Sequence, residues 1–245
     1  MDLDLTSEQE QLRDSVRGIC ARHSGLDVVR QLEDDPVGYP EKLWLGLAEL
    51  GINDMGDLGM LDGVVVYQEL GRSLAPSPHF VSSVLSAGLL ARIGGEKPVD
   101  AISTPAWLEP EGGFGPKGVT TRVDGNGKVT GVKRHVAFAQ AADQLVVLAR
   151  DSADEIRYVL VDPKADGVTL TQQMTIGSDA QYRVDLDGAA GEVLPTGGWA
   201  AWDETMHDGI ILLAAQAVGG ARYALDITVQ YAKDRHQFDK PLGAF

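Results

Sequence analysis

The first 98 residues carry apolar side chains at the three- to four-residue spacing of amphipathic helices. In residues 5 to 23, one such face is formed by Leu12, Val16, Ile19 and Cys20. Thr6 with Gln9, or Ser7 with Glu10, fits a capping box at the start of this helix. The same spacing predicts helices over residues 41–51, 61–74 and 81–93. The N-terminal part is therefore predicted to be a helical bundle.

From about residue 99, the pattern changes to short aliphatic and β-branched runs separated by turn residues. The runs cover residues 119–123, 127–131, 144–149, 156–161, 167–170, 181–187 and 191–194. Turn sequences such as Asp124-Gly-Asn-Gly127 and Asp162-Pro163 lie between them. This spacing predicts an antiparallel β domain, either a sandwich or a small barrel.

Helical periodicity returns near Trp202 and continues toward the end of the sequence. One helix with an apolar face cannot bury that face alone. We therefore expect the rest of a bundle to lie outside this sequence, or another chain to take its place. The three patterns predict an α+β multidomain protein: an N-terminal α-helical domain (1–98), a middle β domain (99–200) and the incomplete beginning of a C-terminal helical bundle (201–245).

A short polar and aromatic segment, Arg235-His-Gln-Phe238, follows this last helix, with Pro241 soon after. A guanidinium fork at a helix C-terminus can bind a phosphate, and a nearby aromatic ring can pack on another ring. Read alone, the segment is explained better by a surface Arg and a buried Phe that close a helical hairpin.

Charge and cysteine content limit the class of protein. The formal net charge of −15 argues against nucleic acid and anionic membrane surfaces as partners. The single Cys20 excludes an internal disulfide, and the five His residues lack metal-ligand spacing. We find no apolar run of membrane-spanning length and no signal-peptide pattern, and therefore expect a cytoplasmic protein without a metal site.

Three longer motifs resemble the acyl-CoA dehydrogenase family, and together they extend over most of the chain. The first is Gly219-x-Ala-Arg-x-Ala-Leu-Asp-x-x-x-x-Tyr-Ala-x-x-Arg-x-Gln-Phe-x-Lys-Pro-Leu242. The second, Glu69-Leu-Gly-Arg-x-Leu-Ala-Pro76, is similar to a segment of the family's N-terminal domain. The third is the middle-domain pattern between Gly131 and Ala149.

The resemblance implies FAD-dependent α,β-dehydrogenation of an acyl-CoA thioester. In the family, the Arg and Gln of the last motif reach the ADP part of an FAD held by a neighbouring subunit. The resemblance therefore assigns cofactor binding to Arg235 and Gln237, with Phe238 as the packing aromatic. It also implies a homo- or hetero-oligomer, a dimer or tetramer, that shares FAD sites.

Several positions depart from the family pattern. Leu108 and Ala137 stand where members carry a Thr that bonds the flavin. Glu111-Gly-Gly-Phe-Gly115 replaces a run of small residues near flavin and substrate, and Asp239 replaces the Gly that usually follows the Phe. The loop that follows Gly51 is shorter and more acidic than is usual, which predicts a different acyl pocket.

The sequence shows no catalytic base. One subgroup of the family places its Glu where this chain has Gly209, and the other subgroups place it in the distal bundle. Asp208 and Glu204 are nearby acids, but Asp208 points about 100° away around the helix. Two main hypotheses remain: an acyl-CoA dehydrogenase of lipid or sterol side-chain catabolism, or a catalytically silent subunit that completes the FAD site of an active paralogue. A related flavoprotein oxidase is a third.

Overall fold

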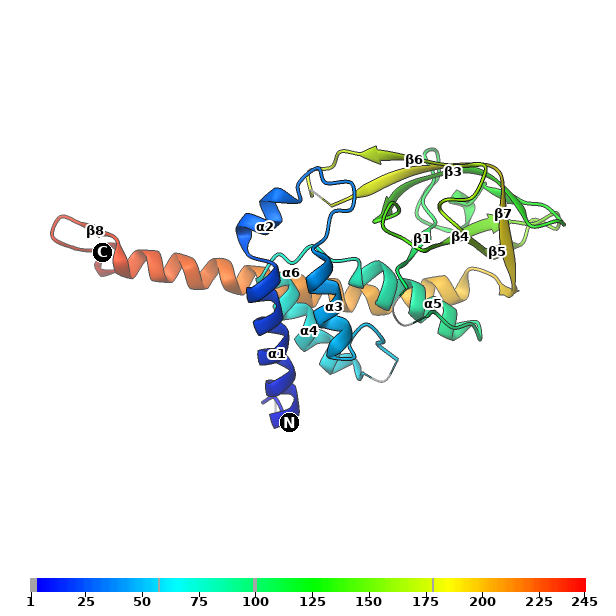
Figure 1. Ribbon diagram of the computed structural model, residues 1–245. Helices are drawn as coiled ribbons and strands as arrows, with labels where there is room; N and C mark the ends of the chain where they lie inside the picture. The colour runs from blue at the N-terminus through cyan, green and yellow to red at the C-terminus, as the bar shows by residue number, and fades with distance from the viewer. Residues whose placement is uncertain (1–3, 57, 99–100, 178) are drawn as a thin grey trace.

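The computed structural model describes residues 4–56, 58–98, 101–177 and 179–245, and its N-terminal part is helical (Figure 1). The helices are α1 (Ser7–His23), α2 (Leu26–Gln31), α3 (Glu41–Glu49), α4 (Met60–Arg72), a π-helix η1 (Phe80–Ser86) and α5 (Ala87–Arg92). The capping box of α1 is the one with Thr6 as N-cap: Thr6 Oγ1 accepts from Gln9 N at 3.2 Å, and Gln9 Oε1 accepts from Thr6 N at 3.1 Å. The sequence pattern does not predict α2, because none of its residues is buried and no apolar periodicity results.

Seven strands follow: β1 (Ser103–Ala106), β2 (Arg122–Val123), β3 (Lys128–Ala137), β4 (Gln144–Arg150), β5 (Ile156–Val161), β6 (Val168–Gln173) and β7 (Gln181–Gly197), with a short 3₁₀ helix η2 (Pro116–Gly118) before β2. The two runs predicted over 181–187 and 191–194 form one strand, β7. That strand stays paired through its middle, where Ala190 faces Lys128 and Gly191 faces Val161. Most of the run predicted over 119–123 is not a strand.

The sheet closes on itself, because its pairings run from β4 through β2, β3, β7 and β5 back to β4. Its interior is filled by Val129, Val147 and Val159, all fully buried. The predicted antiparallel arrangement holds for most pairings, among them β3 with β7 and β4 with β5, but β1 and β2 each pair with β4 in parallel. These parallel pairings join distant residues, Ser103 with Gln144 and Arg122 with Arg150, and no local pattern encodes them.

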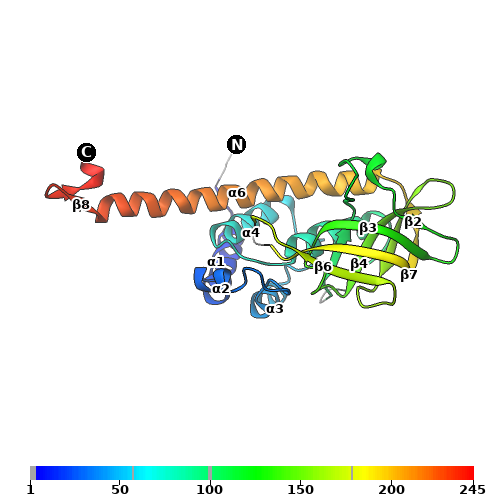
Figure 2. The same cartoon turned by 90° about the horizontal axis from the view of Figure 1, so that it is seen from above.

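The last helix, α6 (Ala200–Asp234), runs past α4 and α5, and its second half projects beyond the other elements (Figures 1 and 2). It approaches α4 closely where glycines face carbonyl groups. A Cβ added to Gly71 would lie 1.9 Å from Gln216 O, and one added to Gly219 would lie 1.9 Å from Gln68 O. Glycine at these two positions lets the helices touch backbone to backbone.

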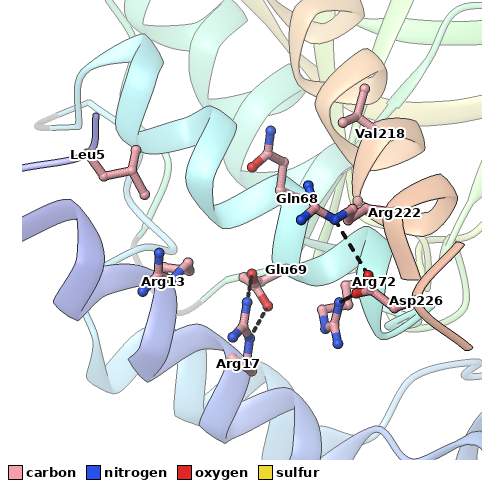
Figure 3. A pocket seen from close by; sticks show the side chains of 10 residues that line it. Leu5, Arg13, Arg17, Gln68, Glu69, Arg72, Val218, Arg222 and Asp226 are labelled. Atoms are coloured by element: carbon pink, nitrogen blue, oxygen red, sulfur yellow. Dashed lines mark hydrogen bonds and ion pairs between the residues drawn. The ribbon is translucent and has the colours of Figure 1, made fainter. Parts of the chain in front are cut away.

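Ion pairs attach α1 and α6 to α4 around a cleft of about 460 Å³ (Figure 3). Arg17 on α1 donates to both carboxylate oxygens of the buried Glu69, at 2.7 and 2.9 Å. Arg72 on the other side donates to Asp226 of α6 at 2.9 Å. The Glu69-Leu-Gly-Arg72 motif therefore has a structural explanation: its charged ends each hold another helix, and Gly71 gives α6 room.

The expectation that no apolar segment reaches membrane-spanning length is wrong for α6. By length and composition alone α6 is long and apolar enough to cross a bilayer, although core helices of soluble proteins meet the same criteria. Its apolar residues lie all around the helix. Trp202 and Leu212 are buried, whereas Val218 and Leu225 are more than half exposed. The expected cytoplasmic location stays a prediction. So does the division into three domains, whose first boundary adjoins residues 99 and 100, outside the described residues.

Candidate functional site

The segment Arg235–Phe238 forms an exposed hairpin at the far end of α6. Arg235 is the C-cap, and its backbone N donates to Tyr231 O. Strands β8 (His236–Gln237) and β9 (Lys240–Pro241) then pair around a two-residue turn. Phe238 and Asp239 have φ angles of 51° and 62°, which match the primed turns that join tight hairpins.

The hairpin leaves the three predicted cofactor residues together and open to solvent. Phe238 is 87% exposed, and its ring meets only Phe245, edge-on at 6.3 Å. Gln237 Nε2 donates to its neighbour His236 O at 2.9 Å. The Arg235 guanidinium is exposed and has no ion pair within the described part of the chain. Because all three side chains are exposed, they are accessible to a ligand or to another subunit.

The barrel end of α6 carries the other candidate positions, and it is tightly filled. Trp107 packs between Trp202, at 5.4 Å between ring centroids, and Phe114, at 6.2 Å. Trp202 is fully buried. Trp199 completes the cluster at 6.5 Å from Trp107. The loop just after β1 is thus closed against the start of α6 by aromatic rings.

A buried ion pair between Glu109 of the same loop and Lys133 of β3 holds the loop against the barrel. Lys133 Nζ on β3 donates to Glu109 Oε1 at 2.7 Å and to Leu148 O at 2.6 Å. Glu109 also accepts from the backbone N of Thr120 and of Thr121, each at 3.0 Å. Burial lowers the pKa of Lys133 to about 8. Burial also raises the pKa of Glu109, but the ammonium and the hydrogen bonds outweigh it, and the net pKa lies below the usual range.

Gly209 lies on the buried side of α6, against the π-helix. A Cβ added there would lie 3.0 Å from Leu85 Cδ2 and 3.2 Å from Phe80 Cζ. The two neighbouring acids are both engaged by one guanidinium: Asp208 accepts from Arg92 Nη2, and Glu204 lies 3.7 Å from Arg92 Nε. The structure therefore places no free carboxylate at this point of the helix.

Two further expectations concern histidines and metals. Among the described residues, no group of three or more His, Cys, Asp and Glu side chains is arranged to hold a metal ion. His135 lies exposed on β3, where its Nδ1 is 2.8 Å from Gln181 Oε1. This supports the reading of His135 as a surface strand residue.

Comparison with known proteins agrees with this geometry. Residues 196–245 match the family model described as the C-terminal domain of acyl-CoA dehydrogenase. The acyl-CoA dehydrogenase IpdE2 of Mycobacterium tuberculosis is 30% identical over 247 residues, which cover 97% of this chain and 68% of that protein. The chain belongs to the acyl-CoA dehydrogenase family.

Solved structures of the family match the whole arrangement of helices and barrel. The ChsE4–ChsE5 complex from Mycobacterium tuberculosis superposes with a TM-score of 0.84 at 26% identity, over all of this chain and 72% of that one. A variant of the Tcur3481–Tcur3483 steroid acyl-CoA dehydrogenase gives a TM-score of 0.81 at 29% identity, over 97% of this chain and 70% of that one. Each of these two structures is named for a pair of different proteins.

The residues at the hairpin end of α6 fit the family cofactor better than those at the barrel end. At the hairpin, an exposed guanidinium and an exposed aromatic ring match what a pyrophosphate and a purine need. At the barrel, Leu108 and Ala137 provide no hydroxyl donor for a flavin. The main-chain O of Leu108 accepts from Arg134 N, and that of Ala137 accepts from Thr104 Oγ1. Trp107 and Phe114 stack on the neighbouring surface.

Sequence reasoning misses three features of the site: the π-helix, the aromatic closure, and the ion pair below the loop. Only the ion pair leaves a signal, because Lys133 is one of the three buried residues of β3, with Val129 and Val136, and a buried lysine requires a carboxylate partner. The family departure at Asp239 also gains an explanation. The position needs a positive φ, which glycine adopts freely and Asp tolerates better than most residues.

Proposed function

We propose that this chain is a subunit of an FAD-dependent acyl-CoA dehydrogenase that works beside a second, homologous subunit and has no catalytic base of its own on α6. The observation that carries this proposal is Gly209, which has no side chain and at which even a Cβ would lie 3.0 Å from Leu85 Cδ2 and 3.2 Å from Phe80 Cζ. The pairing of Asp208 and Glu204 with Arg92 removes the nearest substitutes.

In this proposal the hairpin is the part of the chain that contacts FAD. The Arg235 guanidinium donates to the pyrophosphate of an FAD held by the neighbouring subunit, Gln237 adds a polar contact, and Phe238 packs on the nucleotide. Bound FAD would accept the β hydrogen of the acyl thioester as hydride, after a carboxylate of the partner removes the α proton.

The distance between the two ends of α6 supports a shared site. With 35 residues, the helix is about 50 Å long, so its hairpin and the barrel cannot touch the same cofactor within one subunit (Figure 2). For the substrate, we propose an acyl-CoA of lipid or steroid side-chain catabolism. The support is the similarity to the Tcur3481–Tcur3483 protein, which is a steroid acyl-CoA dehydrogenase.

The alternative is a subunit that holds its own FAD and takes its base from another part of a helical bundle. The barrel and the family motifs of this chain favour this alternative. Leu108 and Ala137, which offer no hydroxyl to a flavin, and Gly209, which offers no carboxylate, argue against it. The FAD content of the purified protein distinguishes these two alternatives. We expect the purified chain to be colourless, and an assembly co-expressed with a family paralogue from the same organism to carry flavin absorbance. Flavin at unit stoichiometry in the chain alone would support the alternative.

The hairpin assignment has its own test. Arg235→Ala in the flavin-bearing assembly removes the proposed pyrophosphate contact, and we expect it to lower FAD affinity at least tenfold. Lys233→Ala is the matched control, because Lys233 is an exposed cation two residues earlier on the same helix. Unchanged FAD affinity in Arg235→Ala, measured by flavin release on dilution, would contradict the assignment.

A further inference from the structure

The cleft between α1, α4 and α6 concentrates positive charge (Figure 3). Four arginines from the three helices line it: Arg13, Arg17, Arg72 and Arg222. Two carboxylates, those of Glu69 and Asp226, line it as well. The lining residues therefore carry more positive than negative charge, in a chain whose formal net charge is −15. A cleft lined mainly by one sign of charge focuses the field and attracts ions of the other sign.

One carboxylate of this cleft is shared between two guanidinium groups. Asp226 Oδ2 accepts from Arg72 Nη1 at 2.9 Å, and Asp226 Oδ1 lies 3.6 Å from Arg222 Nε, which is too long for a hydrogen bond. Because one carboxylate cannot neutralise two cations, this group of three residues keeps one positive charge. The Arg222 side chain is 75% exposed and can turn toward a ligand in the cleft.

The guanidinium of Arg17 is held in place from α4. Glu69 is 5% exposed and accepts from both Nε and Nη2 of Arg17, which fixes the plane of that guanidinium. Two of its five N–H groups are used in this way, so three remain for another acceptor. Arg13 lies one turn earlier on α1. Its partners Asp14, at 3.0 Å, and Glu10, at 3.8 Å, are more than half exposed and are not among the lining residues.

The size and lining of the cleft indicate a small organic anion. Its volume of about 460 Å³ falls within the roughly 300–1,000 Å³ of ligand pockets and exceeds what a single inorganic ion fills. Leu5 and Val218 give it apolar walls, and Gln68 adds an amide. Guanidinium groups bind phosphate through paired N–H donors, and a phosphate monoester carries a charge of about −1.5 to −2 at pH 7. A phosphate monoester therefore fits the charge better than a single carboxylate.

We infer that this cleft binds a small organic phosphate monoester. The phosphate lies between Arg17 of α1 and Arg222 of α6, and Arg13 is a further contact. The organic part lies against Leu5 and Val218. The inference goes beyond the proposed function and does not depend on it, because the cleft contains none of the hairpin residues and its ligand can be measured without flavin.

The test compares three probes by calorimetric titration of the full chain: phenyl phosphate, methyl phenyl phosphate and inorganic phosphate. Phenyl phosphate and its methyl ester share the ring but differ by about one negative charge, so the ratio of their affinities reports on the charge of the cleft. We expect one phenyl phosphate per chain, bound about fivefold more tightly than the methyl ester. Inorganic phosphate lacks the ring and should bind more weakly than phenyl phosphate.

Two variants locate the site. Arg222→Gln should lower the affinity for phenyl phosphate about tenfold, which corresponds to about 1.4 kcal/mol. Arg13→Gln, on another helix of the same cleft, should lower it less, because Arg13 also pairs with acids outside the cleft. Arg122→Gln is the matched control. Arg122 is 57% exposed and pairs with Asp154 at 2.8 Å on the barrel, so its loss should leave the affinity unchanged.

Three outcomes would overturn the inference. The first is no binding of phenyl phosphate at millimolar concentration, or an affinity that Arg222→Gln does not lower. The second is inorganic phosphate bound as tightly as phenyl phosphate, which would mean an adventitious ion only. The third is loss of phenyl phosphate binding when the chain assembles with its paralogue, which would identify the cleft as a contact between subunits. Binding that persists in the assembly and weakens in Arg222→Gln would support the inference.

Discussion

The two ends of α6 differ in how far their apolar side chains are buried. The first half is enclosed: Trp202 and Leu212 are at most 2% exposed, Gly209 touches η1, and aromatic rings close the junction with the barrel. The second half exposes Leu225 by 58% and ends in a hairpin whose Phe238 has almost no cover. At the first end the apolar side chains are buried by other residues of this chain, whereas at the second end they are left exposed. This contrast is what we expect of the subunit proposed above, whose exposed hairpin contacts a neighbouring subunit.

The largest effect is expected where the enclosed end depends on a buried charge pair. Lys133→Met leaves Glu109 as a lone buried carboxylate, and we expect the free energy of unfolding to fall by about 3–5 kcal/mol. Denaturant unfolding measures this loss. The double variant Lys133→Met with Glu109→Gln should recover part of it, because no uncompensated charge remains. A single variant as stable as the original would show that the pair does not hold the loop.

Acid should weaken the helical core through His79. Its Nδ1 accepts from Tyr67 Oη at 2.9 Å, its Nε2 donates to Ile52 O at 2.7 Å, and burial lowers its pKa from 6.5 to about 4. The folded state thus resists a proton that the unfolded chain binds. The stability is complete above pH 6.5 and falls by up to about 3 kcal/mol as the pH drops to 4.

Denaturant unfolding at a series of pH values between 7 and 4 measures the acid effect. His79→Gln keeps one donor and one acceptor but does not titrate, so it should show a shallower loss over this window. An identical pH profile in the variant would mean that other groups, Glu109 among them, account for the acid sensitivity.

Gly209→Glu tests the closed position directly. The new side chain meets Phe80 and Leu85, and we expect a loss of about 1–3 kcal/mol from overpacking and no gain of dehydrogenase activity. Gly220→Glu on the same helix is the control, because the nearest atom to its Cβ is Gly71 O at 3.4 Å. Activity restored by Gly209→Glu would contradict the account of a closed site.

The smallest effect is expected at the open end. Leu225→Ala should change the free energy of unfolding of the isolated chain by no more than about 0.5 kcal/mol, since the side chain is mostly in water. Leu212→Ala, its buried counterpart on the same helix, should cost about 2–5 kcal/mol. A large loss for Leu225→Ala alone would show that the exposed half is already covered, as in a homodimer.

Periodicity predicts much of this fold, because amphipathic helices and buried strands leave local signals. A capping box at Thr6 or Ser7 and the separation of helical from β regions follow from the sequence, and the structure selects Thr6. The parallel pairing of β1 with β4 does not, because it depends on contacts between distant residues. The π-helix also leaves no signal, since residues 80–86 read as an ordinary helix.

The candidate site divides in the same way. The resemblance identifies Arg235, Gln237 and Phe238, and the structure brings them together on one exposed hairpin. The resemblance does not predict that Phe80 and Leu85 lie against Gly209, because those contacts join residues more than 120 positions apart. The sequence shows that Gly209 supplies no carboxylate, whereas the packing of Phe80 and Leu85 against it is evident only from the structure.

The central claim is that this subunit serves another subunit's FAD and does not hold one at its own barrel. The most direct test is the ratio of FAD to polypeptide in the purified assembly of this chain with its paralogue, from flavin absorbance and total amino-acid analysis. The account predicts one FAD for each pair of unlike subunits. One FAD for every polypeptide would contradict it.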